Sequence, residues 1–313
     1  MGTTAPFPKE ADERGRFVRQ ESRFREWVTA DGSSPHPAEA GRYHLYVSYA
    51  CPWAHRTIIV RRLKGLEGVI GLSAVDPVRD ERGWAFTGER RCGPDPVNGF
   101  RFLSEAYAAS DPSFDGRVTV PVLWDTLTGR IVSNESADII RMLNSAFDEW
   151  GDPGVDLYPA DLRGEIDAVN ARVYRDVNDG VYRSGFAASQ DAYEEAVLPL
   201  FATLDWLDER LARQRYLVGG RITEADWRLF TTLLRFDPVY VGHFKCNIRR
   251  IADYPALSGY LRDLYQVPGV AETVDFDHIK RHYYVTHRTI NPTGIVPVGP
   301  AIDLDAPHGR EGL

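Results

Sequence analysis

Cys51 is the residue of this sequence that is best placed to carry out chemistry. Apolar and polar residues alternate over 43–49, which predicts a half-buried strand, and residues 54–63 predict a helix directly after it. Pro52 suits the first turn of that helix, because the N–H group that it lacks would be unpaired there anyway. The free amide N–H groups and the positive dipole end at a helix start stabilise a thiolate, the nucleophilic form of cysteine. We therefore expect Cys51 to have a lowered pKa and to be the reactive centre of a thiol-dependent enzyme.

The composition is that of an ordinary globular chain, whose 313 residues are enough for two domains. The net charge of −8 argues against a nucleic-acid partner, and no apolar run approaches the ~20 residues that a membrane span requires. Three widely spaced cysteines, Cys51, Cys92 and Cys246, exclude a disulfide scaffold and favour a reducing compartment. The N-terminus lacks the apolar segment of a signal peptide, and no Cys/His spacing predicts a metal site. We expect a cytoplasmic protein in which Cys92 and Cys246 have no catalytic part.

Residues 41–152 are expected to form the domain that positions Cys51. Short apolar runs bounded by turn residues predict further strands at 69–75, 118–124 and 131–132. The last two of these strands form a hairpin, and a helix follows from Asn134-Glu135-Ser136. The order β-α-β-insert-β-β-α is the thioredoxin-like arrangement, in which the helix between the first two strands implies that they pair in parallel.

Two features interrupt this domain. A long insert at 76–116 is rich in Gly, Pro, Asp and Arg and holds one helical candidate, near 103–109, so we expect it to be functional or mobile. Pro121 stands in the third strand, where proline cannot donate to the sheet. It fits at the start of that strand, and a cis Val120–Pro121 bond is one way to make the turn.

From residue 153 to 284 the hydrophobic period changes to that of helices, and we expect an all-helical domain. Helices are predicted around 162–177, 197–211, 223–234 and 255–267. Pro199 is a candidate kink, and Thr223 to Asp226 form a capping box. Residues 1–40 are expected to be an arm anchored by Phe17, Phe24 and Trp27, and 285–313 an extended tail.

The chain resembles the Xi class of the cytosolic glutathione transferases, the glutathionyl-hydroquinone reductases. The resemblance runs from about residue 24 to 300 and is carried by motifs in the order 51–56 (CPWAHR), 119–125 (TVPVLWD), 134–136 (NES), 180–187 (GVYRSGFA), 278–284 (HIKRHYY) and 291–297 (NPTGIVP). It implies a thioredoxin-like domain followed by an all-helical domain. It also implies that Cys51 attacks the sulfur of a glutathionyl-hydroquinone, releases the hydroquinone and forms a mixed disulfide that a second glutathione resolves. The segment 51–54 (CPWA) has no second cysteine, so an external thiol must complete the exchange.

The resemblance also implies a glutathione platform, made of Trp84, Arg117, Thr119, Val120, Glu135 and Ser136. The Val120 backbone would pair with the cysteinyl segment of glutathione as one strand pairs with another. Ser136 and the helix start would hold the γ-glutamyl carboxylate, while Glu135 would take the ammonium group. Glu135 and Ser136 could also be a simple N-cap, and Trp84 a core residue. His55 is expected to be a surface or packing histidine rather than a general base.

Three tyrosines complete the site that the resemblance implies. Tyr182 would donate a proton to the ring carbon that loses its sulfur. Tyr240 and Tyr283 would stabilise the thiolate by hydrogen bonds, which lowers its pKa. Tyr284 could replace Tyr283 in this role, and each of these tyrosines could instead be a core aromatic with a satisfied hydroxyl.

Three other functions stay open from the sequence. The first is an Omega-like deglutathionylase or dehydroascorbate reductase, which would also use Cys51. The second is the same chemistry with another low-molecular-weight thiol, such as mycothiol. The third is a non-catalytic, transferase-like interaction module, against which the complete ligand set argues. The resemblance further implies a homodimer that binds small thiols and quinone conjugates and no metal.

Overall fold

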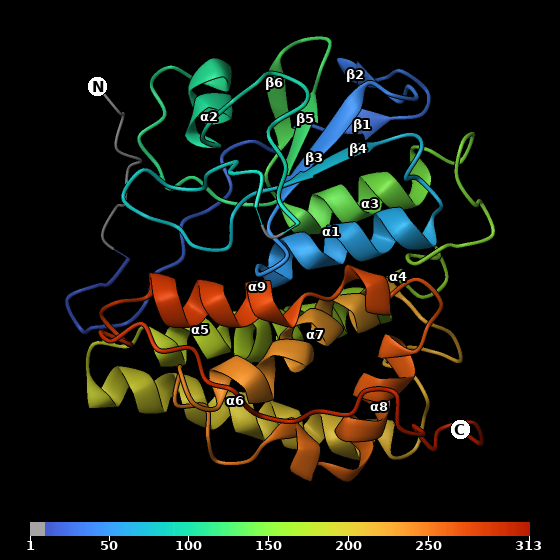
Figure 1. Cartoon of the computed structure of the whole chain (residues 1–313). Helices are drawn as coiled ribbons and strands as arrows, with labels where there is room; N and C mark the ends of the chain where they lie inside the picture. The colour runs from blue at the N-terminus through green and yellow to red at the C-terminus, as the bar shows by residue number, and fades with distance from the viewer. Residues whose placement is uncertain (1–9, 90) are drawn as a thin grey trace.

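The computed structural model describes residues 10–89 and 91–313, so the first nine residues of the predicted arm lie outside it. An α/β half holds the central sheet, and a half made of helices lies beneath it in Figure 1. The helices α1 (Pro52–Leu63) and α3 (Ser136–Ser145) lie between the sheet and the helical half. Cys51 therefore stands where the two halves meet.

The sheet has four strands in the order β4-β3-β5-β6. Its strands are β3 (Tyr43–Val47), β4 (Gly71–Ala74), β5 (Val122–Asp125) and β6 (Arg130–Ser133). Strand β3 pairs with β4 in parallel and with β5 in antiparallel fashion, and β5 forms the predicted hairpin with β6. Every residue of β3 is buried, because helices cover one face and the insert covers the other. The thioredoxin-like prediction is confirmed.

The two interruptions of the sheet lie as the sequence predicts. The Val120–Pro121 bond is cis, and β5 begins only after the proline. The insert holds α2 (Ser104–Ser110) and is fixed on the sheet by Asp95, whose carboxylate accepts a hydrogen bond from the Tyr46 hydroxyl at 2.9 Å. The backbone N–H groups of Val97 and Phe100 donate to the same carboxylate.

The described part of the arm crosses both halves. Phe17 packs against Phe186 of the helical half, and Phe24 packs against Tyr107 of the insert, so both predicted anchors are confirmed. Trp27 is 37% exposed, which corrects its prediction as an anchor. The arm also forms a small sheet from β1 (Val28–Thr29) and β2 (His36–Pro37), which the sequence did not indicate.

The lower half consists of α-helices, several of which end in a wider π-helical turn. Its α-helices are α4 (Arg163–Val173), α5 (Gly180–Gly185), α6 (Gln190–Leu211), α7 (Glu224–Arg235), α8 (Pro255–Tyr265) and α9 (Phe276–Arg281). The π-helices are η1 (Tyr174–Asn178), η2 (Phe236–Tyr240) and η5 (His282–Thr286), and short 3-10 turns are η3 (Ile251–Asp253) and η4 (Ala271–Thr273). Pro199 lies inside α6 without ending it, and the Thr223 capping box begins α7 as predicted.

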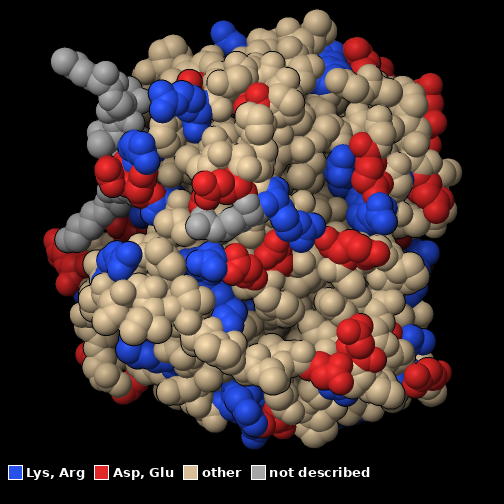
Figure 2. Space-filling view, in the orientation of Figure 1, with Lys and Arg blue, Asp and Glu red and all other residues tan. Residues whose placement is uncertain are grey.

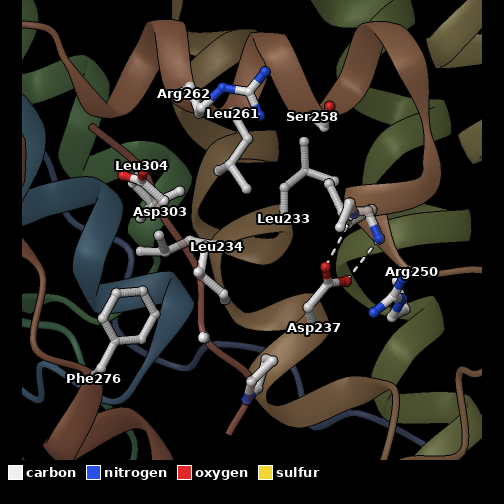
Figure 3. Close-up of a pocket in the computed structure, with 15 residues that line it drawn as sticks. Leu233, Leu234, Asp237, Arg250, Ser258, Leu261, Arg262, Phe276, Asp303 and Leu304 are labelled. Atoms are coloured by element: carbon white, nitrogen blue, oxygen red, sulfur yellow. Dashed lines mark hydrogen bonds between the residues drawn. The ribbon is translucent and has the colours of Figure 1, made fainter. Parts of the chain in front are cut away.

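The C-terminal tail runs along the helical half and packs into it, as Figure 1 shows. Leu304 and Arg310 are 5% and 3% exposed. Figure 3 shows tail residues Asp303 and Leu304 beside Leu234 and Phe276 at a cavity of about 160 Å³, which Cys51 does not line. The dashed lines there mark the backbone N–H groups of residues 251 and 252 donating to the Asp237 carboxylate. Leu304 and Arg310 thus anchor the tail on the helical half.

Basic and acidic side chains are interspersed over the face of the molecule that Figure 2 shows. None of the helices in the described ranges is both long and apolar enough to cross a membrane. The same ranges contain no cluster of three or more His, Cys, Asp or Glu side chains that could hold a metal ion.

Candidate active site

Cys51 is the N-cap residue of α1, directly after the loop that leaves β3. Its thiol is partly exposed and donates a hydrogen bond of 3.5 Å to the Val120 carbonyl, which precedes the cis proline. The two sequence-distant motifs, 51–56 and 119–125, therefore meet at the sulfur. The predicted position of Cys51 at a strand-to-helix junction is confirmed.

The electrostatics of the thiol differ from the sequence prediction. Burial raises the pKa of Cys51 and outweighs the backbone N–H groups of Ala54 and Trp53 and the charge of Arg235, which lower it. The expectation of a lowered pKa is therefore wrong in direction for this structure. The N–H groups of the helix start do lower the pKa of the thiol as predicted, but burial raises it by more. Because part of the Cys51 surface stays exposed, it differs from the wholly buried Cys246, whose pKa burial raises to about 12.

Three tyrosine hydroxyls form one hydrogen-bonded chain next to this thiol. The Tyr283 hydroxyl lies 2.6 Å from that of Tyr182 and 3.1 Å from that of Tyr240. A hydroxyl has a single proton, so two hydrogen bonds among three hydroxyls leave one proton of the chain to be donated elsewhere. The hydroxyls thus bond to one another, while the thiol donates its hydrogen bond to the Val120 carbonyl. Tyr284 is excluded from the chain, because its hydroxyl donates to the Pro238 carbonyl instead.

Burial keeps all three tyrosines protonated at neutral pH. It raises the pKa of Tyr240 to about 12 and the pKa values of Tyr182 and Tyr283 well above the usual value. The three residues are thus available as donors that add no charge. Tyr240 ends η2, Tyr283 lies in η5, and Tyr182 follows η1 by one turn. π-helical turns often occur at functional sites, because the extra residue redirects side chains from the regular helical face.

Tyr182 and Tyr283 line a cavity of about 110 Å³ together with Cys51, and Trp84, Arg117, Thr119 and Val120 line it as well. Tyr240 lies behind Tyr283 and is wholly buried. The Trp84 ring stacks on His282 with 4.9 Å between ring centres. Trp84 is 4% exposed, as its interpretation as a core residue requires, and it also lines the cavity. Its contact with glutathione stays a prediction.

A second cavity, of about 370 Å³, adjoins the first through Thr119 and Val120. Glu135 and Ser136 line it at the start of α3. Glu135 is the N-cap of this helix, and its carboxylate accepts hydrogen bonds from the Ala137 N–H and from the Ser22 hydroxyl, both at 3.0 Å. The N-cap interpretation is thus correct, and the capped start of α3 still lines the cavity. The structure brings nine of the ten predicted site residues to these two cavities and places Tyr240 directly behind them.

The N-terminal arm supplies residues that the sequence did not reveal. Glu10 forms an ion pair of 2.7 Å with Arg117, and burial raises the pKa of Glu10. The Arg19 guanidinium lies 4.7 Å from the centre of the Tyr182 ring and 4.9 Å from that of Trp53, and it pairs with Asp179 at 2.5 Å. No spacing in the arm indicates these contacts, because only the tertiary fold brings the arm across the site.

The N-terminal domain model of the glutathione S-transferase family matches residues 50–146, and the C-terminal domain model matches 190–263. The glutathionyl-hydroquinone reductase YqjG of Escherichia coli is 55% identical over 95% of this chain and 93% of its own. The glutathionyl-hydroquinone reductase PcpF of Sphingobium chlorophenolicum is 56% identical, over 93% and 91%. The glutathione-bound structure of YqjG superposes with a TM-score of 0.90 over 92% of this chain and 96% of that one, at 55% identity. For the glutathione transferase Xi of Phanerochaete chrysosporium the TM-score is 0.89 at 51% identity, over 93% and 94%.

The chain belongs to the Xi class of the glutathione transferases. The family models cover both halves of the molecule and include Cys51, Glu135 and Ser136. Tyr182 and Tyr283 lie outside the matched segments, so their place in the site comes from the geometry described above.

Proposed function

We propose that this Xi-class transferase is a glutathionyl-hydroquinone reductase, a glutathione-dependent oxidoreductase. The observation that carries the proposal is the partly exposed Cys51 thiol in one cavity with Tyr182 and Tyr283, two protonated hydroxyls. A nucleophile and an acid on the same cavity suit a reaction that breaks a carbon–sulfur bond and protonates the carbon. The reductases YqjG and PcpF, at 55% and 56% identity, support this choice of substrate.

In the proposed reaction the Cys51 thiolate attacks the sulfur of the glutathionyl group. A sulfur–sulfur bond forms, the bond between sulfur and the ring breaks, and its electron pair remains on the ring carbon. Tyr182 donates a proton to that carbon, which completes the hydroquinone. The thiolate of a second glutathione then attacks the mixed disulfide, releases glutathione disulfide and restores Cys51. The thiol proton of that second glutathione replaces the proton that the ring took.

The tyrosine chain suits the stabilisation of the tyrosinate that this donation leaves. When Tyr182 has donated its proton, the Tyr283 hydroxyl can donate a hydrogen bond to its oxygen across 2.6 Å and accept one from Tyr240 across 3.1 Å. Tyr182 lines the cavity and can recover a proton there, whereas Tyr240 is wholly buried. The Arg19 guanidinium over the Tyr182 ring favours that anion and lowers the pKa of Tyr182, against the effect of burial.

The second cavity is proposed to hold the peptide part of glutathione. Val120 would pair with its cysteinyl backbone, and Thr119 lies beside it on both cavities. The start of α3 at Ser136 would receive the γ-glutamyl carboxylate, and Glu135 the ammonium group. Trp84 and Arg117 would hold the other end by packing and by charge.

We further propose that residues 41–152 are the thiol-binding domain and 153–284 the helical domain, between the arm 1–40 and the tail 285–313. The protein is proposed to act in the cytoplasm as a homodimer on small thiols and quinone conjugates, without metal, nucleic acid or membrane.

Turnover of a synthetic glutathionyl-hydroquinone, followed by chromatography of the released hydroquinone, tests the function. Cys51→Ser is expected to abolish release, because a hydroxyl is a far weaker nucleophile than a thiolate. Cys246→Ala is the matched control, since it removes a wholly buried thiol that is not among the lining residues of either cavity. Substantial hydroquinone release by folded Cys51→Ser protein would overturn the proposal.

A further inference from the structure

Arg235, at the end of α7, is a wholly buried cation that holds the loop before Cys51. Its Nε–H donates to the Ala50 carbonyl and one Nη2–H to the Tyr49 carbonyl, both at 2.8 Å. These two carbonyls directly precede the nucleophile in the chain. An arginine of the helical half thus fixes the backbone that carries the thiol of the thioredoxin-like half.

The remaining contacts of this guanidinium are also with uncharged groups. Nη1 donates to the Thr231 carbonyl at 2.7 Å and lies 3.2 Å from Nδ1 of His55. Burial and the charge of Arg235 hold the pKa of His55 well below its usual value, so its ring is neutral. Nδ1 then accepts from Arg235, and Nε2–H donates to the Thr273 hydroxyl at 2.8 Å. The buried histidine is a packing residue, as one of the two sequence interpretations had it.

Among residues 10–89 and 91–313, no carboxylate forms an ion pair with Arg235. A buried charge is costly unless an opposite charge compensates it, and buried arginines are therefore usually paired. In the described part of the chain, the acids on which the guanidinium charge acts are the Cys51 thiol and the hydroxyls of Tyr240 and Tyr283. The charge of Arg235 lowers the pKa values of Cys51, Tyr240 and Tyr283.

We propose that Arg235 is a positioning residue for the reaction: its cation, held by the carbonyls of Tyr49 and Ala50, is the buried counter-charge of the Cys51 thiolate. The Cys51 thiolate is then fully stabilised only when the helical half contacts the loop that carries Tyr49 and Ala50. This proposal rests on the role of Cys51 as nucleophile in the proposed function, and adds the residue that balances its charge.

Other groups also affect the pKa of the thiol, and their effects must be distinguished from that of Arg235. The charged groups coupled to the thiol, by element, are Arg19 of the arm, Arg56 of α1, Arg79 of the insert and Arg235 of α7. The neutral hydroxyls of Tyr182 (α5) and Tyr240 (η2) also face it, and a Cys51 thiolate raises their pKa values. Among the arginines that lower the pKa of Cys51, Arg235 acts more strongly than Arg19. Arg19 in addition has a carboxylate partner, Asp179, whereas the bonds of Arg235 all go to neutral groups.

The test is the rate of Cys51 alkylation by iodoacetamide between pH 6 and 10, followed by intact mass. The assay needs neither glutathione nor a hydroquinone. Its result can therefore be interpreted even if the substrate in the proposed function is wrong. Arg235→Met and Arg235→Gln remove the charge, and Gln keeps an N–H donor for a carbonyl. Arg235→Lys restores the charge with fewer donors. Arg228→Met is the matched control, since it removes another buried arginine of α7, one that pairs with Glu224.

Both neutral variants are expected to raise the thiol pKa by about one unit, which makes alkylation at pH 8 about tenfold slower. Arg235→Lys is expected to recover most of the rate, and Arg228→Met to leave it unchanged. A purely structural role would lower stability without moving the pH profile. An unshifted profile in folded Arg235→Gln, or an equal shift in Arg228→Met, would overturn the proposal. If Arg235→Met does not fold, the comparison of Arg235→Gln with Arg235→Lys tests the proposal in the same way.

Discussion

The replacement Tyr182→Phe separates the two chemical steps that the site is proposed to perform. It removes a single hydroxyl, together with its 2.6 Å hydrogen bond to Tyr283, and leaves the ring against Phe186, Phe244 and Arg19. Loss of one hydrogen bond costs about 1 kcal/mol of folding free energy, so the protein is expected to stay folded. Loss of a general acid slows its step by about 10²–10⁴-fold, or about 3–5 kcal/mol of activation free energy.

This slower rate is expected only for substrates in which the sulfur–carbon bond breaks, because the ring carbon must then receive a proton. Reduction of a mixed disulfide between glutathione and a small thiol releases a thiolate, which needs no proton from Tyr182. We therefore expect Tyr182→Phe to lower kcat for hydroquinone release by two orders of magnitude or more and kcat for disulfide reduction by only a few-fold. Chromatography of the hydroquinone and a coupled assay of glutathione disulfide measure the two rates on one preparation.

Tyr284→Phe is the matched control, because its hydroxyl donates to the Pro238 carbonyl outside the tyrosine chain. Both rates should stay near those of the unmodified protein. If Tyr182→Phe slowed the two reactions equally, the hydroxyl would serve the thiol or the packing, and the assignment of Tyr182 as acid would be refuted. Burial raises the pKa of Tyr182, so the hydroxyl is expected to remain an acid throughout the neutral range.

The remaining predictions concern the thiol and the glutathione platform. Since burial raises the pKa of Cys51, its alkylation rate is expected to climb with pH through the neutral range and to level off only above ~8.5, the value of a free cysteine; a plateau below pH 7 would contradict the effect of burial. Glu135→Gln keeps an acceptor for the Ala137 N–H and loses the charge, so it should raise KM for glutathione without changing Tm; an unchanged KM would remove Glu135 from the ligand. Glu135→Ala should also lose the cap, about 1 kcal/mol in denaturant unfolding.

Local sequence was enough for the features that depend on a few neighbouring residues. The strand-to-helix junction at Cys51, the strand start at Pro121 and the capping box of α7 are each set by backbone hydrogen bonding within one segment. The thioredoxin-like order and the helical half follow from the change in hydrophobic period near residue 153. The placement of the tyrosines came from the family resemblance, because a tyrosine in an apolar stripe is usually a core residue.

The features that the sequence did not reveal all depend on contacts between distant segments. The sign of the thiol pKa shift is set by the burial of Cys51, which no local pattern reports. Arg19 reaches the site only because the arm crosses both halves, and Arg235 meets the Cys51 loop only across the contact between α7 and α1. The π-helical turns that carry Tyr240 and Tyr283 add one residue within a single helical turn, which is too short a segment to show in a hydrophobic period taken over several turns.

The most direct test of the nucleophilic role is intact mass spectrometry of the protein during turnover of a glutathionyl-hydroquinone. With the second glutathione withheld, we expect the mass to increase by one glutathionyl group, located on Cys51 by peptide mapping and removed when glutathione is added. Parallel incubation with a conjugate of another low-molecular-weight thiol shows which thiol the site accepts. A protein that releases hydroquinone while Cys51 stays unmodified, or that carries the adduct on Cys92 or Cys246, would contradict the proposed mechanism.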